Sequence, residues 1–320
     1  MPMLTVEDLH VRFYTREGII AAVNGVGFTL EKGRVLGILG ESGSGKSVTL
    51  RAILRLLPPL HSKVSGRVLL HGTDLFALSE PEMRHVRGRK MATIFQEPMT
   101  ALDPVFTVGR QIEETIVRHE GVTFAAAHKR ARELLEMVQI PSPERRLSSY
   151  PHELSGGMRQ RAMIAIALSC RPELLLADEP TTALDATVQA QILLLLRSLQ
   201  EQLGMAVILV THDIGVITEV ADEQAVMYAG RFVEYGPVRT VMRTPRHPYT
   251  EGLFNSTAHR SQHGKALYTI PGSPPDPSNL ASGCSFAPRC PLVEDGCLKR
   301  FPDETWFDTN HLVRCFVREM

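Results

Sequence analysis

A glycine-rich segment at residues 40–47, GESGSGKS, has the residue types and spacing that hold phosphate groups in proteins. The apolar run 35–39 precedes it, and residues 48–57, which have helical spacing, follow it. A phosphate loop needs this context of strand, turn and helix start, because the helix N-terminus adds positive potential. The context favours a phosphate loop over a chance Gly/Ser loop.

The residues of this loop have distinct chemistry. Gly43 and Gly45 can take backbone angles that turn N–H groups inward. Lys46 can reach the terminal phosphates, and the Ser47 hydroxyl can ligate Mg²⁺. The predicted nucleotide contacts are Gly40, Glu41, Ser42, Gly43, Ser44, Gly45, Lys46, Ser47 and Val48.

Two carboxylates, Asp178 and Glu179, follow the apolar run 174–177. Burying Asp178 beside such a run is costly unless a cation pairs with it, and Mg²⁺ held through water is a natural partner. Glu179 is then placed to polarise the water that attacks a γ-phosphate. On this segment alone, a solvated acidic turn before Pro180 is the alternative.

Two further polar residues stand at the ends of predicted strands. His212 follows the apolar run 206–210, where its ring could hydrogen-bond and sense the γ-phosphate. Gln96 follows the strand-like run 91–95. Taken alone, each residue is more often an ordinary polar residue at a strand terminus.

A second helix start suited to anions lies in LSGGM at 154–158. Ser155 can cap the helix that follows, and Gly156 and Gly157 leave its N–H groups open. An ordinary N-cap explains this segment taken alone. Together with the phosphate loop, however, the chain offers two anion-binding helix starts far apart in sequence.

The composition indicates a folded, globular chain that does not bind nucleic acid. The chain has 320 residues, with 35 Lys plus Arg and 35 Asp plus Glu, so no basic excess favours nucleic acid or an anionic membrane. Hydrophobic residues make up 43%, as in globular proteins. The N-terminus lacks the pattern of a signal peptide, and the apolar run near 193–196 is too short to span a bilayer, so we expect a cytoplasmic protein.

The order of the strands and helices that must position these residues predicts an α/β fold with a mostly parallel sheet. Apolar strands and helical stretches alternate through the chain, as buried parallel sheets require. Strands over 4–13 and 21–30 precede them and indicate an antiparallel β subdomain, and a helical insertion is expected at about 98–160. We place an ATP-binding domain at 1–243 and a Pro-rich extension at 244–320.

The motifs together resemble the nucleotide-binding subunit of an ABC transporter. GESGSGKS, Gln96, LSGGM, LLLADEP, ALDAT at 183–187 and His212 occur in this order and cover roughly residues 4–240. The resemblance implies a P-loop ATPase that works as a head-to-tail dimer. Each ATP then lies between the phosphate loop of one chain and the LSGG segment of a second ATP-binding subunit. Two membrane-spanning permease subunits complete the transporter.

The resemblance also implies a role for each motif residue. Lys46 and Ser47 hold phosphate and Mg²⁺, and Asp178 holds Mg²⁺ through water. Glu179 is the base, and His212 is the γ-phosphate switch. The catalytic set is then Lys46, Gln96, Glu179 and His212, and the magnesium set is Ser47, Gln96 and Asp178, with Gln96 as the lid glutamine.

Other positions are assigned to the adenine and to the dimer. Phe13 falls where the family places an aromatic ring that stacks on adenine, with Tyr14 as the alternative and core packing possible for both. The segment from Ser155 through Gly156 to Gly157 should contact the partner's ATP, and Asp185 should lie at the dimer seam. One residue departs from the common signature, which ends in Gln where this chain has Met158.

A closer resemblance is to the ATP-binding subunits of dipeptide and oligopeptide importers. It rests on YPHELSGGMRQRAMIAIAL at 150–168, FQEPMTALDP at 95–104, PRHPYTEGL at 245–253 and GCSFAPRCP at 283–291. It implies a peripheral subunit on the cytoplasmic face of the inner membrane, served by an extracytoplasmic solute-binding protein. Nickel, glutathione and some sugar importers share the subfamily, so these solutes are alternatives to peptides.

Four cysteines, Cys284, Cys290, Cys297 and Cys315, crowd the extension in the pattern C-x5-C-x6-C-x17-C. A reducing compartment makes disulfides a poor first explanation, and four thiolates in a loop-rich tail suit Zn²⁺ or a [4Fe-4S] cluster. The peptide-importer resemblance implies the [4Fe-4S] cluster. Four unligated cysteines are the alternative.

Two other classes of function are less favoured. A DNA-repair-type ABC ATPase would need long heptad arms or a basic face, and the sequence has neither. Its basic run, with Arg84, Arg87, Arg89 and Lys90, is explained as a solvated face. A regulatory subunit that does not hydrolyse ATP is disfavoured because Glu179 and His212 are both present.

Overall fold

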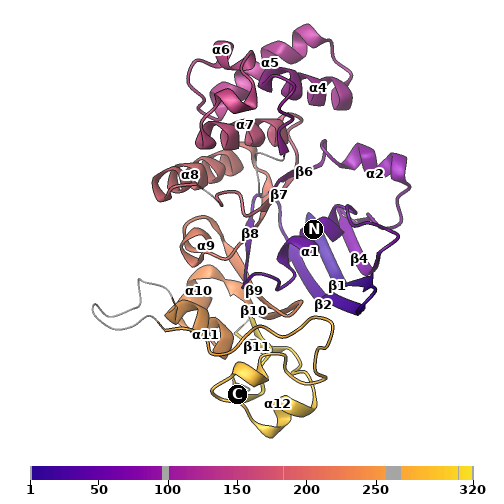
Figure 1. The fold of residues 1–320 in the computed structure, drawn as a ribbon, viewed down its shortest axis with the longest axis vertical. Helices are drawn as coiled ribbons and strands as arrows, with labels where there is room; N and C mark the ends of the chain where they lie inside the picture. Colours follow the sequence, from indigo (N-terminus) through magenta and orange to yellow (C-terminus); the bar gives the residue numbers. More distant parts are fainter. Residues whose placement is uncertain (1, 96–100, 183, 257–267, 309, 319–320) are drawn as a thin grey trace. The chain divides into compact units, whose positions relative to one another are not determined.

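The computed structural model describes residues 2–95, 101–182, 184–256, 268–308 and 310–318 (Figure 1). The chain forms two compact units. The first unit comprises Met1–Leu30, Val35–Phe76 and Val210–Met320, and the second comprises Glu31–Arg34 and Ala77–Leu209. No helix among the described residues is long and apolar enough to cross a membrane.

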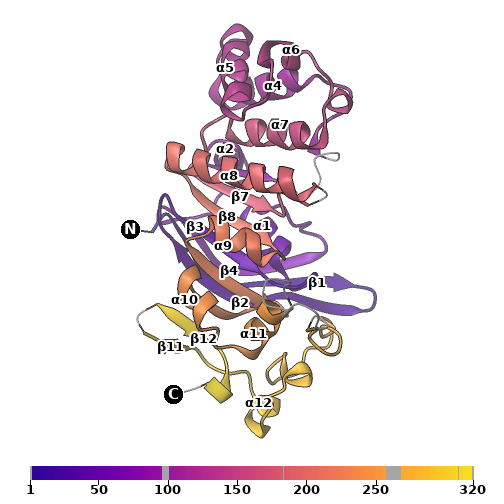
Figure 2. The same ribbon diagram turned by 90° about the vertical axis from the view of Figure 1, so that its left-hand side faces the viewer.

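An antiparallel sheet in the first unit has the strand order β2-β1-β4-β5. Figure 2 labels its three long strands, β1, β2 and β4. Its strands are β1 (Leu4–Thr15), β2 (Gly18–Leu30), β4 (Ser62–Leu70) and β5 (Thr73–Asp74). Alternate residues of β1 are buried, but the alternation shifts by one position around Asp8, which has a φ of 47°. The pairing of β1 with β2 and with β4 shifts register at the same place, so a β-bulge keeps the apolar side chains on one face.

A second sheet of the first unit includes the C-terminal extension. Its strands are β3 (Val35–Leu39), β9 (Glu223–Tyr228), β10 (Arg231–Pro237), β11 (Thr305–Phe307) and β12 (His311–Val313). β3 pairs with β9 in parallel, whereas β9–β10, β10–β12 and β11–β12 are antiparallel. Ala229 and Gly230, both with positive φ, form the hairpin turn between β9 and β10. The last strands of the chain therefore continue the sheet that begins with β3.

Three helices of the first unit, α9 (Ile214–Val220), α10 (Val238–Arg243) and α11 (Pro248–Asn255), contribute to one buried apolar core cluster. This unit also contains α1 (Lys46–Ile53) and α12 (Asp295–Lys299), with short 3₁₀ turns η2 (Ala287–Arg289) and η3 (Phe316–Arg318). Tyr228 of β9, Tyr249 of α11 and Phe286 before η2 are buried in one cluster, with ring centroids 4.5 to 5.4 Å apart. The extension is thus part of the core of this unit.

One buried carboxylate, Glu234 of β10, ties the extension to the sheet. It accepts hydrogen bonds from the backbone N–H of Arg246 (2.8 Å) and of His247 (3.0 Å), and its Oε1 lies 2.8 Å from Nε2 of His311 on β12. Burial lowers the pKa of His247 to about 4, so this ring is neutral and its Nδ1 accepts the N–H of Tyr249. Three polar partners offset the cost of burying the charge of Glu234.

The second unit contains strands β6 (Met91–Ile94), β7 (Leu174–Asp178) and most of β8 (Ala206–Thr211), in the order β8-β7-β6. β6 and β7 run parallel, with Met91 opposite Leu174. All residues of β7 and β8 are buried, as expected for strands covered on both faces. These strands confirm the parallel pattern that the apolar runs predicted.

In the described part of the second unit, seven helical segments accompany these strands, and α4 to α7 form a helical group (Figure 1). They are α2 (Glu80–Val86), α4 (Val108–Glu120), α5 (Phe124–Met137), α6 (Pro143–Leu147), η1 (Pro151–Glu153), α7 (Gly156–Leu168) and α8 (Ala186–Leu203). Side chains of Thr107, Thr123, Ser155 and Asp185 cap the starts of α4, α5, α7 and α8. The α/β fold predicted from the sequence is confirmed.

Candidate functional site

The phosphate loop joins β3 to α1 in the first unit and approaches two other strands closely. Gly45 has a φ of 107°, and a Cβ on it would lie 2.4 Å from the carbonyl oxygen of Ala22 on β2. A Cβ on Gly40 would lie 2.3 Å from the carbonyl oxygen of Met227 on β9. Only glycine fits at both positions, so the predicted glycine pattern has a steric reason.

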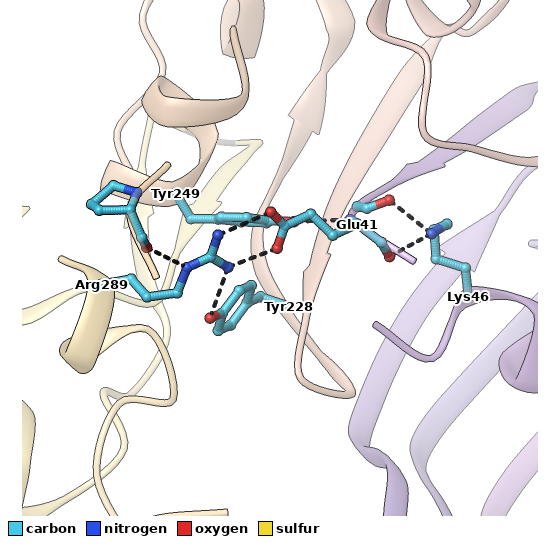
Figure 3. Close-up of polar contacts among 7 residues, drawn as sticks. Glu41, Lys46, Tyr228, Tyr249 and Arg289 are labelled. Carbon is cyan, nitrogen blue, oxygen red and sulfur yellow. Dashed lines mark hydrogen bonds and ion pairs between the residues drawn. The ribbon is translucent and has the colours of Figure 1, made fainter. Parts of the chain in front are cut away.

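Polar groups of this loop are gathered at the start of α1. Lys46 is the first residue of the helix and is buried, and its Nζ donates to the carbonyl oxygens of Gly40 (2.7 Å) and Glu41 (2.8 Å) (Figure 3). Ser44 Oγ is buried without a hydrogen-bond partner in the described part of the chain. A cation, a helix N-terminus and an unsatisfied hydroxyl in one loop fit a phosphate ligand.

Glu41, the second residue of the loop, contacts residues from distant parts of the first unit. Its N–H donates to Tyr249 Oη (2.9 Å), and its carboxylate accepts two hydrogen bonds from Arg289 (Figure 3). The quoted motifs PRHPYTEGL and GCSFAPRCP contain Tyr249 and Arg289, but no local pattern in the sequence linked them to the loop. Arg289 is 248 positions from Glu41, so only the folded chain shows the contact.

Three other predicted residues lie in the first unit. Phe13 is half-buried and Tyr14 is 47% exposed, both near the end of β1. His212 is exposed directly after β8, and Asp213 beside it caps α9 by accepting the N–H of Gly215. Gln96 lies outside the described residues. The adenine, lid and switch roles therefore stay predictions.

The acidic strand end forms in the second unit. Asp178 is buried as the last residue of β7, and Glu179 follows with a φ of 46°. A left-handed backbone is costly for a residue with a side chain and is concentrated at functional sites. Glu179 Oε2 accepts a hydrogen bond from Thr182 Oγ1 (2.9 Å), which fixes the carboxylate.

The LSGG segment and the start of α8 lie together in the second unit. Ser155 Oγ accepts the N–H of Met158, and Asp185 caps α8 by accepting the N–H of Val188. A Cβ on Gly157 would lie 2.8 Å from Val188, so glycine allows the two helix starts to approach. Both predicted interface residues, Ser155 and Asp185, thus also serve as helix caps.

The four tail cysteines are free thiols in one region of the first unit. Cys284 N donates to the carbonyl oxygen of Cys297 (2.7 Å), and Cys284 and Cys290 pack against the Phe286 cluster. Burial, with a smaller contribution from nearby Cys284 and Cys290, raises the pKa of Cys315 to about 11. Among the described residues, no group of three or more His, Cys, Asp or Glu is arranged to hold a metal ion.

Known protein families and structures agree with these features. Residues 23–182 match the family described as "ABC transporter", and residues 233–297 match the "Oligopeptide/dipeptide transporter, C-terminal region". The chain is similar to the dipeptide transport ATP-binding protein DppD of Bacillus subtilis (strain 168), with 48% identity over 99% of this chain and 95% of that one. It is also similar to the oligopeptide transport ATP-binding protein OppD of the same strain, with 52% identity over 90% of this chain and 81% of that one.

Among solved structures, the chain is similar to the dimeric ATP-binding cassette MJ0796 bound to ADP and phosphate. The TM-score is 0.66 and the identity 30%, covering 74% of this chain and 99% of that one. The chain belongs to the ABC transporter family. Within that family it is an ATP-hydrolysing subunit, as the motifs predicted.

Replacing Lys46 should weaken nucleotide binding itself. We expect Lys46→Ala to lower ATP affinity by about tenfold or more, because a charge-assisted hydrogen bond to phosphate contributes roughly 1.5–3 kcal/mol. Equilibrium titration with a fluorescent ATP analogue measures this, with the exposed Lys32→Ala as control. Unchanged affinity in Lys46→Ala would contradict the phosphate-loop assignment.

Replacing Glu179 should separate hydrolysis from binding. We expect Glu179→Gln to keep ATP affinity within about threefold while single-turnover hydrolysis falls about a hundredfold or more, since a general base supplies roughly 10² to 10⁴. The carboxamide keeps the shape of the side chain but not its basicity. The matched control is Glu201→Gln on the exposed side of α8, and near-normal hydrolysis in Glu179→Gln would place the base elsewhere.

Proposed function

We propose that this chain energises the import of dipeptides or oligopeptides by hydrolysing ATP. The observation that carries the proposal is that similarity to DppD covers the extension as well as the ATP-binding part. The match of residues 233–297 to a peptide-transporter C-terminal region also disfavours the DNA-repair class. Nickel, glutathione and sugars are the competing solutes.

We assign the chemistry residue by residue from the family resemblance and the local geometry. From the family resemblance we assign Ser47 and Asp178 to a magnesium ion bound with ATP: Ser47 is the second residue of α1, and Asp178 is buried at the end of β7. Mg²⁺ would offset charge on the phosphates. Lys46 binds the terminal phosphates, and Glu179 accepts a proton from the attacking water. The remaining assignments are His212 to the γ-phosphate, Gln96 to Mg²⁺ and the lid, and Phe13 or Tyr14 to adenine.

The partners follow from the same proposal. A second, identical or homologous ATP-binding subunit pairs head to tail with this chain, so that residues 155–157 contact the partner's ATP and Asp185 lies at the seam. The capped helix starts at Ser155 and Asp185 support this assignment, because their N-terminal N–H groups favour anions. Two permease subunits hold the pair at the cytoplasmic face of the membrane, and an extracytoplasmic binding protein delivers the solute.

The solute is tested by reconstituting the complete complex in proteoliposomes. We expect ATP hydrolysis to rise several-fold when the binding protein carries a dipeptide or oligopeptide, because solute-loaded protein favours the hydrolysing conformation. Binding protein offered nickel, glutathione or a sugar serves as the control. Stimulation by one of these instead of peptide would overturn the peptide assignment and keep the transport ATPase.

We also propose that Cys284, Cys290, Cys297 and Cys315 are the ligands of one metal centre, a [4Fe-4S] cluster in preference to Zn²⁺. The gathering of four thiols in one loop-rich region supports this, although their placement is not that of a formed site. An extension with few apolar runs would gain stability from such a centre.

Metal content tests the cysteine proposal directly. Protein purified without oxygen should contain about four irons per chain and little zinc. Cys290→Ser should lose the iron and become more sensitive to proteolysis in the extension, whereas Cys170→Ser, in a core position of the second unit, should keep the iron. Stoichiometric zinc would show that the centre binds zinc instead of iron. Absence of both metals would refute the proposed metal centre.

A further inference from the structure

The carboxylate of Glu41 is held by an arginine of the C-terminal extension. Arg289 Nη1 donates to Oε2 (2.7 Å) and Nη2 to Oε1 (3.1 Å), a two-pronged ion pair with fixed geometry (Figure 3). The arginine side chain is only 4% exposed and that of Glu41 is 28% exposed. Arg289 is fixed in turn, because its Nε donates to the carbonyl oxygen of Pro271 and Nη1 to Tyr228 Oη.

The backbone of Glu41 is held from the same direction. Its N–H donates to the hydroxyl of Tyr249, which is fully buried on α11. Tyr228 and Phe286 pack against the Tyr249 ring, so the hydroxyl has little freedom. Two independent contacts therefore fix Glu41, and neither comes from the loop itself.

The proline-rich run of the extension approaches the loop at a second place. Pro274, Pro275 and Pro277 line a small cavity together with loop residues 41–44. The carbonyl oxygen of Pro277 accepts the N–H of Ala21 on β2 (3.0 Å). The extension thus lies against the side of the phosphate loop in the first unit.

The position of Glu41 gives these contacts an electrostatic consequence for nucleotide binding. Its carbonyl oxygen accepts a hydrogen bond from Lys46, so Glu41 lies between Arg289 and the lysine of the loop (Figure 3). A carboxylate in a phosphate-binding loop repels the ligand unless its charge is compensated. Arg289 supplies that compensation and also fixes the loop backbone.

We propose that Arg289 is a positioning residue for ATP: through Glu41, the C-terminal extension holds the phosphate loop in its binding shape and cancels an unfavourable charge. The inference rests on the proposed function of this loop in binding ATP. The extension is thereby a working part of the nucleotide site in its own chain, and its integrity sets ATP affinity.

Loss of Arg289 should weaken ATP binding more than loss of Glu41. Arg289→Gln leaves an uncompensated carboxylate in the loop, and we expect ATP to bind about tenfold more weakly. The turnover number at saturating ATP should stay within about threefold, because Arg289 touches none of the reacting atoms. KM for ATP should therefore rise with little change in kcat.

Rescue by a second substitution distinguishes positioning from a general loss of structure. The double variant Glu41→Gln with Arg289→Gln removes both charges but also the hold on the loop, so we expect its ATP affinity to recover most of the loss and to lie about threefold below that of the unmodified chain. Arg289→Lys keeps the charge but not the two-pronged geometry. Its ATP affinity should lie between those of Arg289→Gln and the unmodified chain. The matched control is Arg318→Gln, since Arg318 pairs with Glu251 of α11 and should leave ATP affinity unchanged.

Titration with a fluorescent ATP analogue and steady-state kinetics on the full chain provide these values, with thermal unfolding to verify the fold of each variant. Wild-type affinity in Arg289→Gln would overturn the inference, as would equal losses in the single and double variants. If Arg289→Gln does not fold, a comparison of Arg289→Lys with Glu41→Gln still tests the inference. Arg289→Lys must then bind ATP more weakly than Glu41→Gln. Absence of ATP binding by the unmodified chain would refute the proposed function instead.

Discussion

The phosphate loop depends on the absence of side chains at two positions. The backbone of β9 passes where a Cβ of Gly40 would lie, and the backbone of β2 passes where a Cβ of Gly45 would lie. Because protein interiors are close-packed, a methyl group at either place would have to move a strand. The shape of the loop is therefore set by the packing of the first unit around it, and Lys46 is buried as a result of that packing.

In the second unit, too, residues of the predicted site have roles in the local structure. Ser155 caps the start of α7, and Asp185 caps the start of α8. Gly157 lets these helix starts approach, and Glu179 adopts a left-handed backbone that the surrounding structure must stabilise. In both units the residues assigned to chemistry also have a structural task, so their types are doubly constrained.

The extension is integrated into the first unit by aromatic packing, strand pairing and buried hydrogen bonds. Tyr249 and Phe286 join the core cluster, β12 pairs with β10, and Glu234 binds the ring of His311. The cysteines lie in the same region, since Cys284 and Cys290 pack against the Phe286 cluster. Arg289 precedes Cys290 directly, so the segment that carries the thiols also carries the contact to Glu41.

The sequence by itself determined the family, the α/β fold and the order of the motifs. These follow from local signals: the glycine spacing of residues 40–47, the apolar runs 174–177 and 206–210, and the helix cap at Ser155. The short strands β11 and β12, of three residues each, were not predicted, because a periodic pattern needs more residues to be visible. Only the tertiary structure decided that Glu41 pairs with Arg289 and that Tyr249 binds the loop backbone. Such contacts join residues more than two hundred positions apart, and their energy depends on geometry that no local pattern of residue types encodes.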